Sequence, residues 1–78
     1  MTIETIGKYQ LHLLARPQSP SGLWIPYVTI EEFDETSQDF KLMVERQRAE
    51  GEGFDTEAEA IEAARRYGNI LIRRAALS

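Results

Sequence analysis

The hydrophobic period changes once along this 78-residue chain, and that change limits what the chain can fold into. Up to residue 48, apolar and polar side chains tend to alternate, as they do in half-buried strands. From residue 60 onward, apolar side chains recur every three or four residues, as on one face of a helix. A chain of this length has room for one domain only. We therefore expect a single α+β domain over residues 1–78, with strands followed by one helix.

Three segments have the strand pattern, and clusters of turn-forming residues separate them. These segments are Lys8–Arg16, Leu23–Glu31 and Phe40–Arg48. In the third segment, Phe40, Leu42 and Val44 are expected to share one face. Consecutive strands joined by short connections usually pair with each other in antiparallel fashion. The sequence therefore predicts a three-stranded antiparallel β-meander.

The second of these segments contains Pro26, which leaves the assignment of its two faces open. Proline has no backbone N–H and is rare inside a central strand. It indicates either a bulge or a strand that begins later.

A helix is predicted over residues 56–75. It starts at Thr56-Glu57-Ala58-Glu59, a capping box in which the Thr56 hydroxyl and the Glu59 carboxylate satisfy backbone amides of the first turn. Its apolar stripe consists of Ala60, Ile61, Ala64, Tyr67, Gly68, Leu71 and Ala75. The alternative is a helix that stops at Gly68 and is followed by a short strand, Ile70–Arg73.

This βββα arrangement covers only one face of the sheet, because it has only one helix. The apolar residues expected on the uncovered face are Leu14, Ile25, Tyr27 and Met43. Exposed apolar surface of this kind is typical of an interface. We expect a non-enzymatic interaction module that self-associates or binds a protein partner through this face.

The residue types needed for common catalytic and metal sites are missing or isolated. The chain has no cysteine, which excludes disulfides, zinc-thiolate sites, iron–sulfur clusters and a thiol nucleophile. Its one histidine, His12, has no nucleophile motif beside it. The acidic run at residues 31–35 lacks the ligand spacing of a calcium loop, and Gly51 and Gly53 are not followed by a phosphate-loop lysine. We expect no enzyme activity, no metal and no cofactor.

Charge is unevenly distributed along the chain, whose net charge is −4. Acidic residues concentrate at residues 31–39 and 52–62, whereas four arginines lie in residues 63–78. The arginines that could form a basic patch are Arg46, Arg48, Arg65, Arg66 and Arg73. An alternative function is therefore nucleic-acid binding at the arginine-rich end of the helix. The acidic total disfavours nucleic acid as a partner.

The sequence has neither the pattern of a signal peptide nor a run of about 20 apolar residues that could span a membrane. Residues 1–10 carry Glu4 and Lys8 and contain no long apolar core. We therefore expect a cytoplasmic location and no membrane partner.

The helix start is similar to three groups of βββα proteins. Thr56 to Ala64 resembles the last helix of double-stranded-RNA-binding domains, which implies their core fold; Glu57, Glu59 and Glu62 stand where that family carries lysines. Gly53-Phe54-Asp55-Thr56 with Glu59-Ala60 resembles the helix start of HicB-type antitoxins. Trp24 followed by Phe54-Asp55-Thr56-Glu57-Ala58-Glu59-Ala60 resembles small uncharacterised bacterial proteins, a family without an assigned activity.

Overall fold

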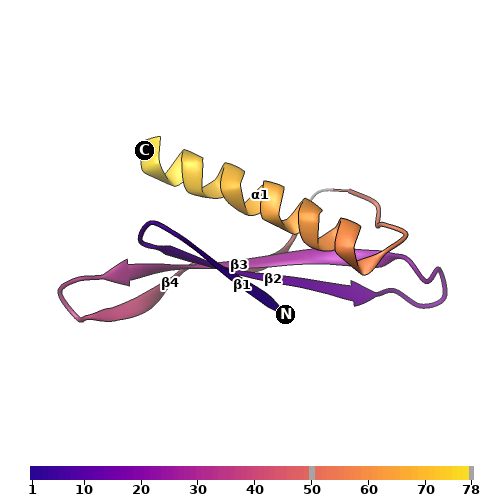
Figure 1. Cartoon of the computed structure of the whole chain (residues 1–78), viewed down its shortest axis with the longest axis horizontal. Helices are drawn as coiled ribbons and strands as arrows, with labels where there is room; N and C mark the ends of the chain where they lie inside the picture. Colours follow the sequence, from indigo (N-terminus) through magenta and orange to yellow (C-terminus); the bar gives the residue numbers. More distant parts are fainter. Residues whose placement is uncertain (50, 78) are drawn as a thin grey trace.

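The computed structural model describes residues 1–49 and 51–77, which form one antiparallel sheet and one helix (Figure 1). The elements in chain order are β1 (Thr2–Ile6), β2 (Tyr9–Pro17), β3 (Trp24–Asp34), β4 (Asp39–Arg48) and α1 (Glu57–Leu77). The strands lie side by side in the same order as in the chain, and each neighbouring pair is antiparallel. The α+β class is confirmed.

The predicted three-stranded meander is wrong, because Thr2–Ile6 forms a fourth strand at the edge beside β2. Ile3 and Ile6 lie three positions apart and so point to opposite faces, which leaves no period-two pattern in this segment. The strand is held in place by a tight turn at Gly7 and Lys8. Gly7 has a φ of 57°, a conformation that glycine adopts without strain and that two-residue hairpins require.

The helix begins with the predicted capping box and continues past Gly68. The Glu59 backbone N–H donates to Thr56 Oγ1 at 3.1 Å, and the Thr56 hydroxyl donates to Glu59 Oε1 at 3.0 Å. The alternative with a strand at Ile70–Arg73 is not adopted, since α1 is continuous to Leu77. Apolar side chains on both sides of Gly68 face the sheet, and their burial keeps the helix intact across this glycine.

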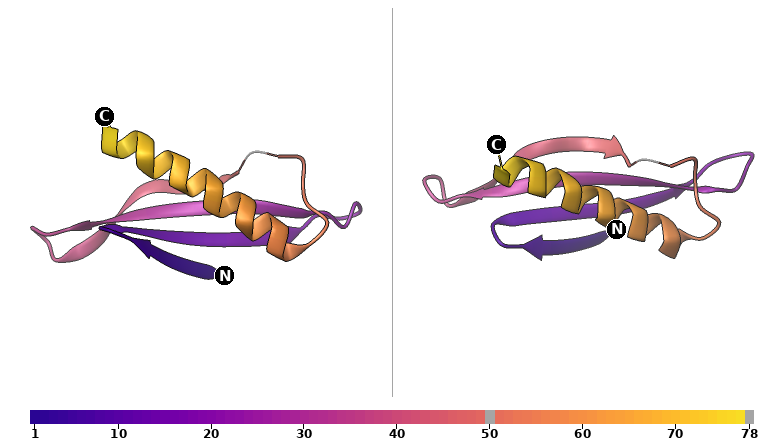
Figure 2. Two further views of the ribbon diagram at one scale, coloured as in Figure 1. Left: turned by 45° about the horizontal axis from the view of Figure 1, so that its top comes forward. Right: turned by 90° about the horizontal axis from the view of Figure 1, so that it is seen from above.

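The core lies between α1 and the two central strands, β2 and β3, which the helix crosses diagonally (Figure 2). It consists of Tyr9, Leu11, Leu13, Val28, Ile30, Ala64 and Ile72. The helix lies close against the sheet at Gly68, where an added Cβ would lie 2.7 Å from Leu11 Cδ2 and 3.3 Å from Val28 Cγ2. The small residues of the helix therefore set how closely it packs on the sheet.

Two bulges interrupt β4 and change which of its side chains face the core. Val44 pairs with Ile30, while Leu42 pairs with Glu31, so Met43 is an extra residue on the β4 side. Leu42 and Val44 consequently point to opposite faces, and the prediction that they share a face is wrong. A second shift lies between Ile30 and Val28.

Pro26 fits inside β3 because of where its missing N–H would point. The N–H and C=O of Trp24 both bond to Phe54, and the C=O of Pro26, two residues on, accepts from Ala49 on the same side. On that side β4 ends at Arg48. The position of Pro26 therefore interrupts no bond between β3 and β4.

We expect Gly68→Ala to destabilise the protein by about 1 kcal/mol. An alanine gains about 1 kcal/mol of helix propensity over glycine, but the methyl group must displace the fully buried Leu11 side chain, at an overpacking cost of about 1–3 kcal/mol. Denaturant unfolding measures the change in the free energy of unfolding. The reference is the stability difference between Arg66→Ala and Arg66→Gly, which reports helix propensity alone because Arg66 is exposed on the same helix. A stability gain for Gly68→Ala equal to that reference would contradict the close packing.

Candidate functional site

Within residues 1–49 and 51–77, no helix or strand lies over the face of the sheet opposite α1 (Figure 1). Residues that are paired across neighbouring strands point to the same face, so the register identifies the side chains there. We call this surface the open face. Its rows across the sheet are Arg16 and Ile25; Leu14, Tyr27 and Arg48; Ile3, His12 and Thr29; Thr5, Gln10, Glu31 and Leu42; and Phe33 and Phe40.

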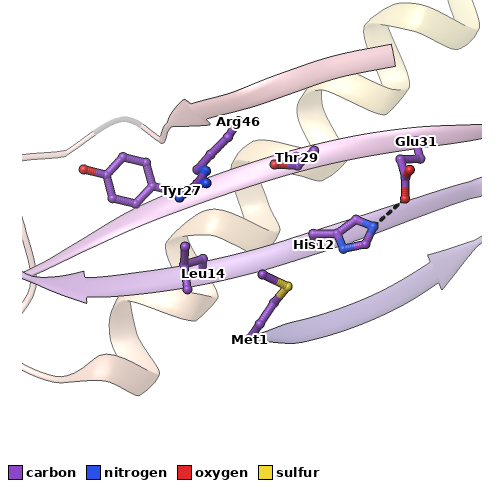
Figure 3. Close-up of a pocket in the computed structure, with 7 residues that line it drawn as sticks. All are labelled: Met1, His12, Leu14, Tyr27, Thr29, Glu31 and Arg46. Atoms are coloured by element: carbon purple, nitrogen blue, oxygen red, sulfur yellow. Dashed lines mark hydrogen bonds and ion pairs between the residues drawn. The ribbon is translucent and has the colours of Figure 1, made fainter. Parts of the chain in front are cut away.

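A shallow hollow of about 190 Å³ lies on the open face (Figure 3). The residues that line it are Met1, His12, Leu14, Tyr27, Thr29, Glu31 and Arg46. Apolar groups from Met1 and Leu14 lie beside the polar groups of His12 and Glu31. The hollow therefore combines apolar and polar side chains, a mixture that is common in binding surfaces.

His12 and Glu31 form the polar contact drawn as a dashed line in Figure 3. His12 Nε2 lies 2.6 Å from Glu31 Oε1, and both side chains are about three-quarters buried. Thr29 stands directly opposite His12, so Glu31 reaches the imidazole diagonally from the next position on the same face. The contact holds the carboxylate in a defined position and uses only one of its two oxygens.

Arg46 extends from β4 over the hollow and is exposed. Its guanidinium makes no hydrogen bond or ion pair with any residue in the ranges 1–49 and 51–77. A guanidinium offers five N–H donors in a planar fork that matches a carboxylate. Arg46 is therefore a cation at the margin of the hollow with its donors available.

The structure brings together only two of the four residues expected on the uncovered face. Leu14 and Tyr27 are cross-strand neighbours and both line the hollow. Ile25 lies on the same face but is only 4% exposed, since the segment at Gly53 passes beside it; a Cβ at Gly53 would lie 3.3 Å from Ile25 Cδ1. Met43 occupies the bulge and packs against the core.

Four exposed apolar residues of the open face were missed in the sequence: Met1, Ile3, Phe40 and Leu42. A signal for Ile3 was present, because four of the five residues of Thr2–Ile6 are β-branched, which favours a strand. No sequence pattern indicated the bulge that turns Leu42 to this face.

The arginines of the expected basic patch do not form one surface. Arg46 lies over the open face, whereas Arg66 and Arg73 are exposed on α1, on the other side of the sheet. Arg48 Nη2 donates to the Gly51 carbonyl at 3.1 Å. Arg65 is held by acids: its Nε donates to both oxygens of Glu4, at 2.9 and 2.8 Å, and its Nη1 pairs with Glu62.

Residues 1–49 and 51–77 contain no cluster of three or more histidine, aspartate and glutamate side chains arranged to hold a metal ion. Their helix lacks the length of apolar sequence needed to cross a membrane.

Comparison with known protein families, with curated proteins and with solved structures finds no significant match to this chain. The resemblances drawn from the helix start therefore remain predictions. The case for a function rests on the residues of the open face.

The ion pair between Glu4 and Arg65 joins the edge strand β1 to α1 and makes stability depend on pH. The hydrogen bond from Arg65 lowers the pKa of Glu4 below its ordinary value. The stabilisation is therefore fully present above the ordinary pKa of a glutamate, which applies in the unfolded chain, and is lost as pH falls through the lower folded pKa.

We expect Glu4→Gln to reduce the free energy of unfolding by about 1 kcal/mol at pH 7, because the pair is partly exposed and screened. At pH about 2 the difference between the variant and the original protein should be smaller, because protons compete with Arg65 for the Glu4 carboxylate. Glu52→Gln, at an exposed acid, is the control and should change little at either pH. Denaturant unfolding at both pH values makes the comparison. A Glu4→Gln effect that is the same at both would refute the assignment.

Proposed function

We propose that this chain is a protein-interaction module that self-associates through the open face of its sheet. One observation supports this most directly: exposed or half-buried apolar side chains from all four strands lie on that face, while α1 covers the other. They include Ile3 on β1, Leu14 on β2, Tyr27 on β3 and Leu42 on β4, and Ile3 and Leu42 are 54% and 57% exposed. Several exposed apolar side chains gathered on one face of a small domain are typical of an interaction surface.

The size of the open face suits a small homodimer. The four strands hold 5, 9, 11 and 10 residues, and with strands about 4.8 Å apart and a rise of about 3.3 Å per residue they give a flat area on the order of 550 Å². Stable interfaces bury at least about 600 Å² on each partner. Two copies that meet over most of the open face would therefore come close to the lower end of the range for stable association.

The edges of the sheet are less suited to pairing than the open face. β4 carries two bulges, and Lys41, Arg46 and Arg48 add charges along it. Bulges and charged side chains are devices that prevent a further strand from pairing with an edge. β1, at the other edge, is only five residues long. Face-to-face packing is therefore the favoured mode of association.

A second copy also adds buried apolar area, of which a domain this small has little. A chain of 78 residues buries about 60% of the surface that its unfolded form exposes, so its core contributes little excess stability. Packing two open faces together buries further apolar area from each chain, which stabilises both.

We expect the protein to form a dimer over the concentration range from about 5 to about 500 μM, where weak association is measurable. Tyr27→Lys should raise the dissociation constant at least about 30-fold, because it places a charge at the centre of the interface. Sedimentation equilibrium gives both constants. Ile70→Lys is the matched control, since Ile70 is an exposed apolar residue on the helix, and it should leave association unchanged.

Two results would count against the proposal. One is a protein that stays monomeric up to the highest concentration. The other is a dimer that Ile70→Lys dissociates and Tyr27→Lys does not, because that result would place the interface on the helix.

A further inference from the structure

Two charged groups on the open face have hydrogen-bonding capacity that the chain itself does not use. Arg46 makes no hydrogen bond or ion pair with the described residues, and its exposed guanidinium lies over the hollow. Glu31 uses Oε1 for His12, and its Oε2 has no contact of that kind with the residues described. Figure 3 shows Arg46 near Tyr27 and Glu31 beside His12, at separate points around the same hollow.

We propose that Arg46 of each copy binds Glu31 of the other, so that two identical ion pairs orient a two-fold dimer. This inference rests on the proposed self-association and adds the orientation of the two copies. The required chemistry is on one surface: an available cation, a positioned anion and apolar side chains around both.

Symmetry makes the two contacts reciprocal. In a two-fold interface, if residue i of one copy contacts residue j of the other, then j of the first contacts i of the second. Two faces that pack against each other are related by an axis that lies in the plane between them. An axis half-way between Arg46 and Glu31 brings each group opposite its counterpart, so one arrangement forms both pairs.

The surroundings favour this pairing over other orientations. Leu14, Tyr27 and Met1 line the same hollow, and in a dimer they would exclude water from the charges, which strengthens their attraction. An orientation that placed Arg46 against Arg46 would bury like charges, at a cost that disfavours it. His12 holds the Glu31 carboxylate in place before association, so less conformational freedom is lost on binding.

Charge exchange between two variants tests the proposal. In a homodimer of Arg46→Glu, both contacts between positions 46 and 31 join two acids. In a homodimer of Glu31→Arg, both of these contacts join two arginines. We expect each variant to associate at least ten-fold more weakly than the original protein. An equimolar mixture should associate about as tightly as the original protein, because a heterodimer contains two opposite-charge pairs.

The controls keep the result specific. Arg73→Glu changes net charge in the same way as Arg46→Glu, but from the exposed side of α1, and on its own it should associate as tightly as the original protein. Thermal unfolding checks that each variant is folded. If Glu31→Arg does not fold, Glu31→Lys replaces it in the same mixture.

The possible results separate this inference from the proposed function. If the original protein is monomeric, both fail. If it is a dimer that Tyr27→Lys dissociates, but mixing Arg46→Glu with Glu31→Arg restores nothing, the open face remains the interface and the ion pairs are wrong. Single variants with unchanged affinity would overturn the ion pairs as well. The ion pairs are supported only if each variant associates weakly by itself and mixing the two variants restores association.

Discussion

The width of one helix is the constraint on which the rest of this structure depends. A helix is about 10 Å across and strands are about 4.8 Å apart, so one helix covers about two strands. α1 lies over β2 and β3 and is brought close to them at Gly68. β1 and β4 extend beyond it on either side. The contact of Glu4 with Arg65 ties β1 to the helix, the bulges in β4 protect the other edge, and the opposite face stays open.

The elements with a clear period were predictable from the sequence, and the others were not. β2 alternates cleanly, and α1 has both a capping box and an apolar stripe, so their local patterns agree with their final environments. β1 was missed because a short edge strand buries little on either face and needs no alternation. The face of Leu42 depends on a bulge, which arises from the pairing of two strands rather than from either strand alone.

The sequence predicted that one face of the sheet would be uncovered and partly apolar, but it identified only some of the residues on that face. Leu14 and Tyr27 lie where alternation places them, whereas the burial of Ile25 depends on a segment about 28 residues further along the chain. Short sequence patterns carry no information about such a contact. The same holds for His12 and Glu31, which are 19 residues apart and meet only because β2 and β3 pair in this register. The residues of a surface formed by four strands can therefore be identified only when the pairing register of the strands is known.

The central claim is that the open face, rather than the helix, joins two copies, and distances between spin labels test it most directly. The chain has no cysteine, so Thr5→Cys on the open face and Arg66→Cys on the outside of α1 each give one labelled site. Sheets that pack face to face lie about 10 Å apart, so we expect about 20 Å between Thr5 labels in a dimer and about 40 Å between Arg66 labels, which lie beyond two helices. A short distance between Arg66 labels and a long one between Thr5 labels would contradict the account.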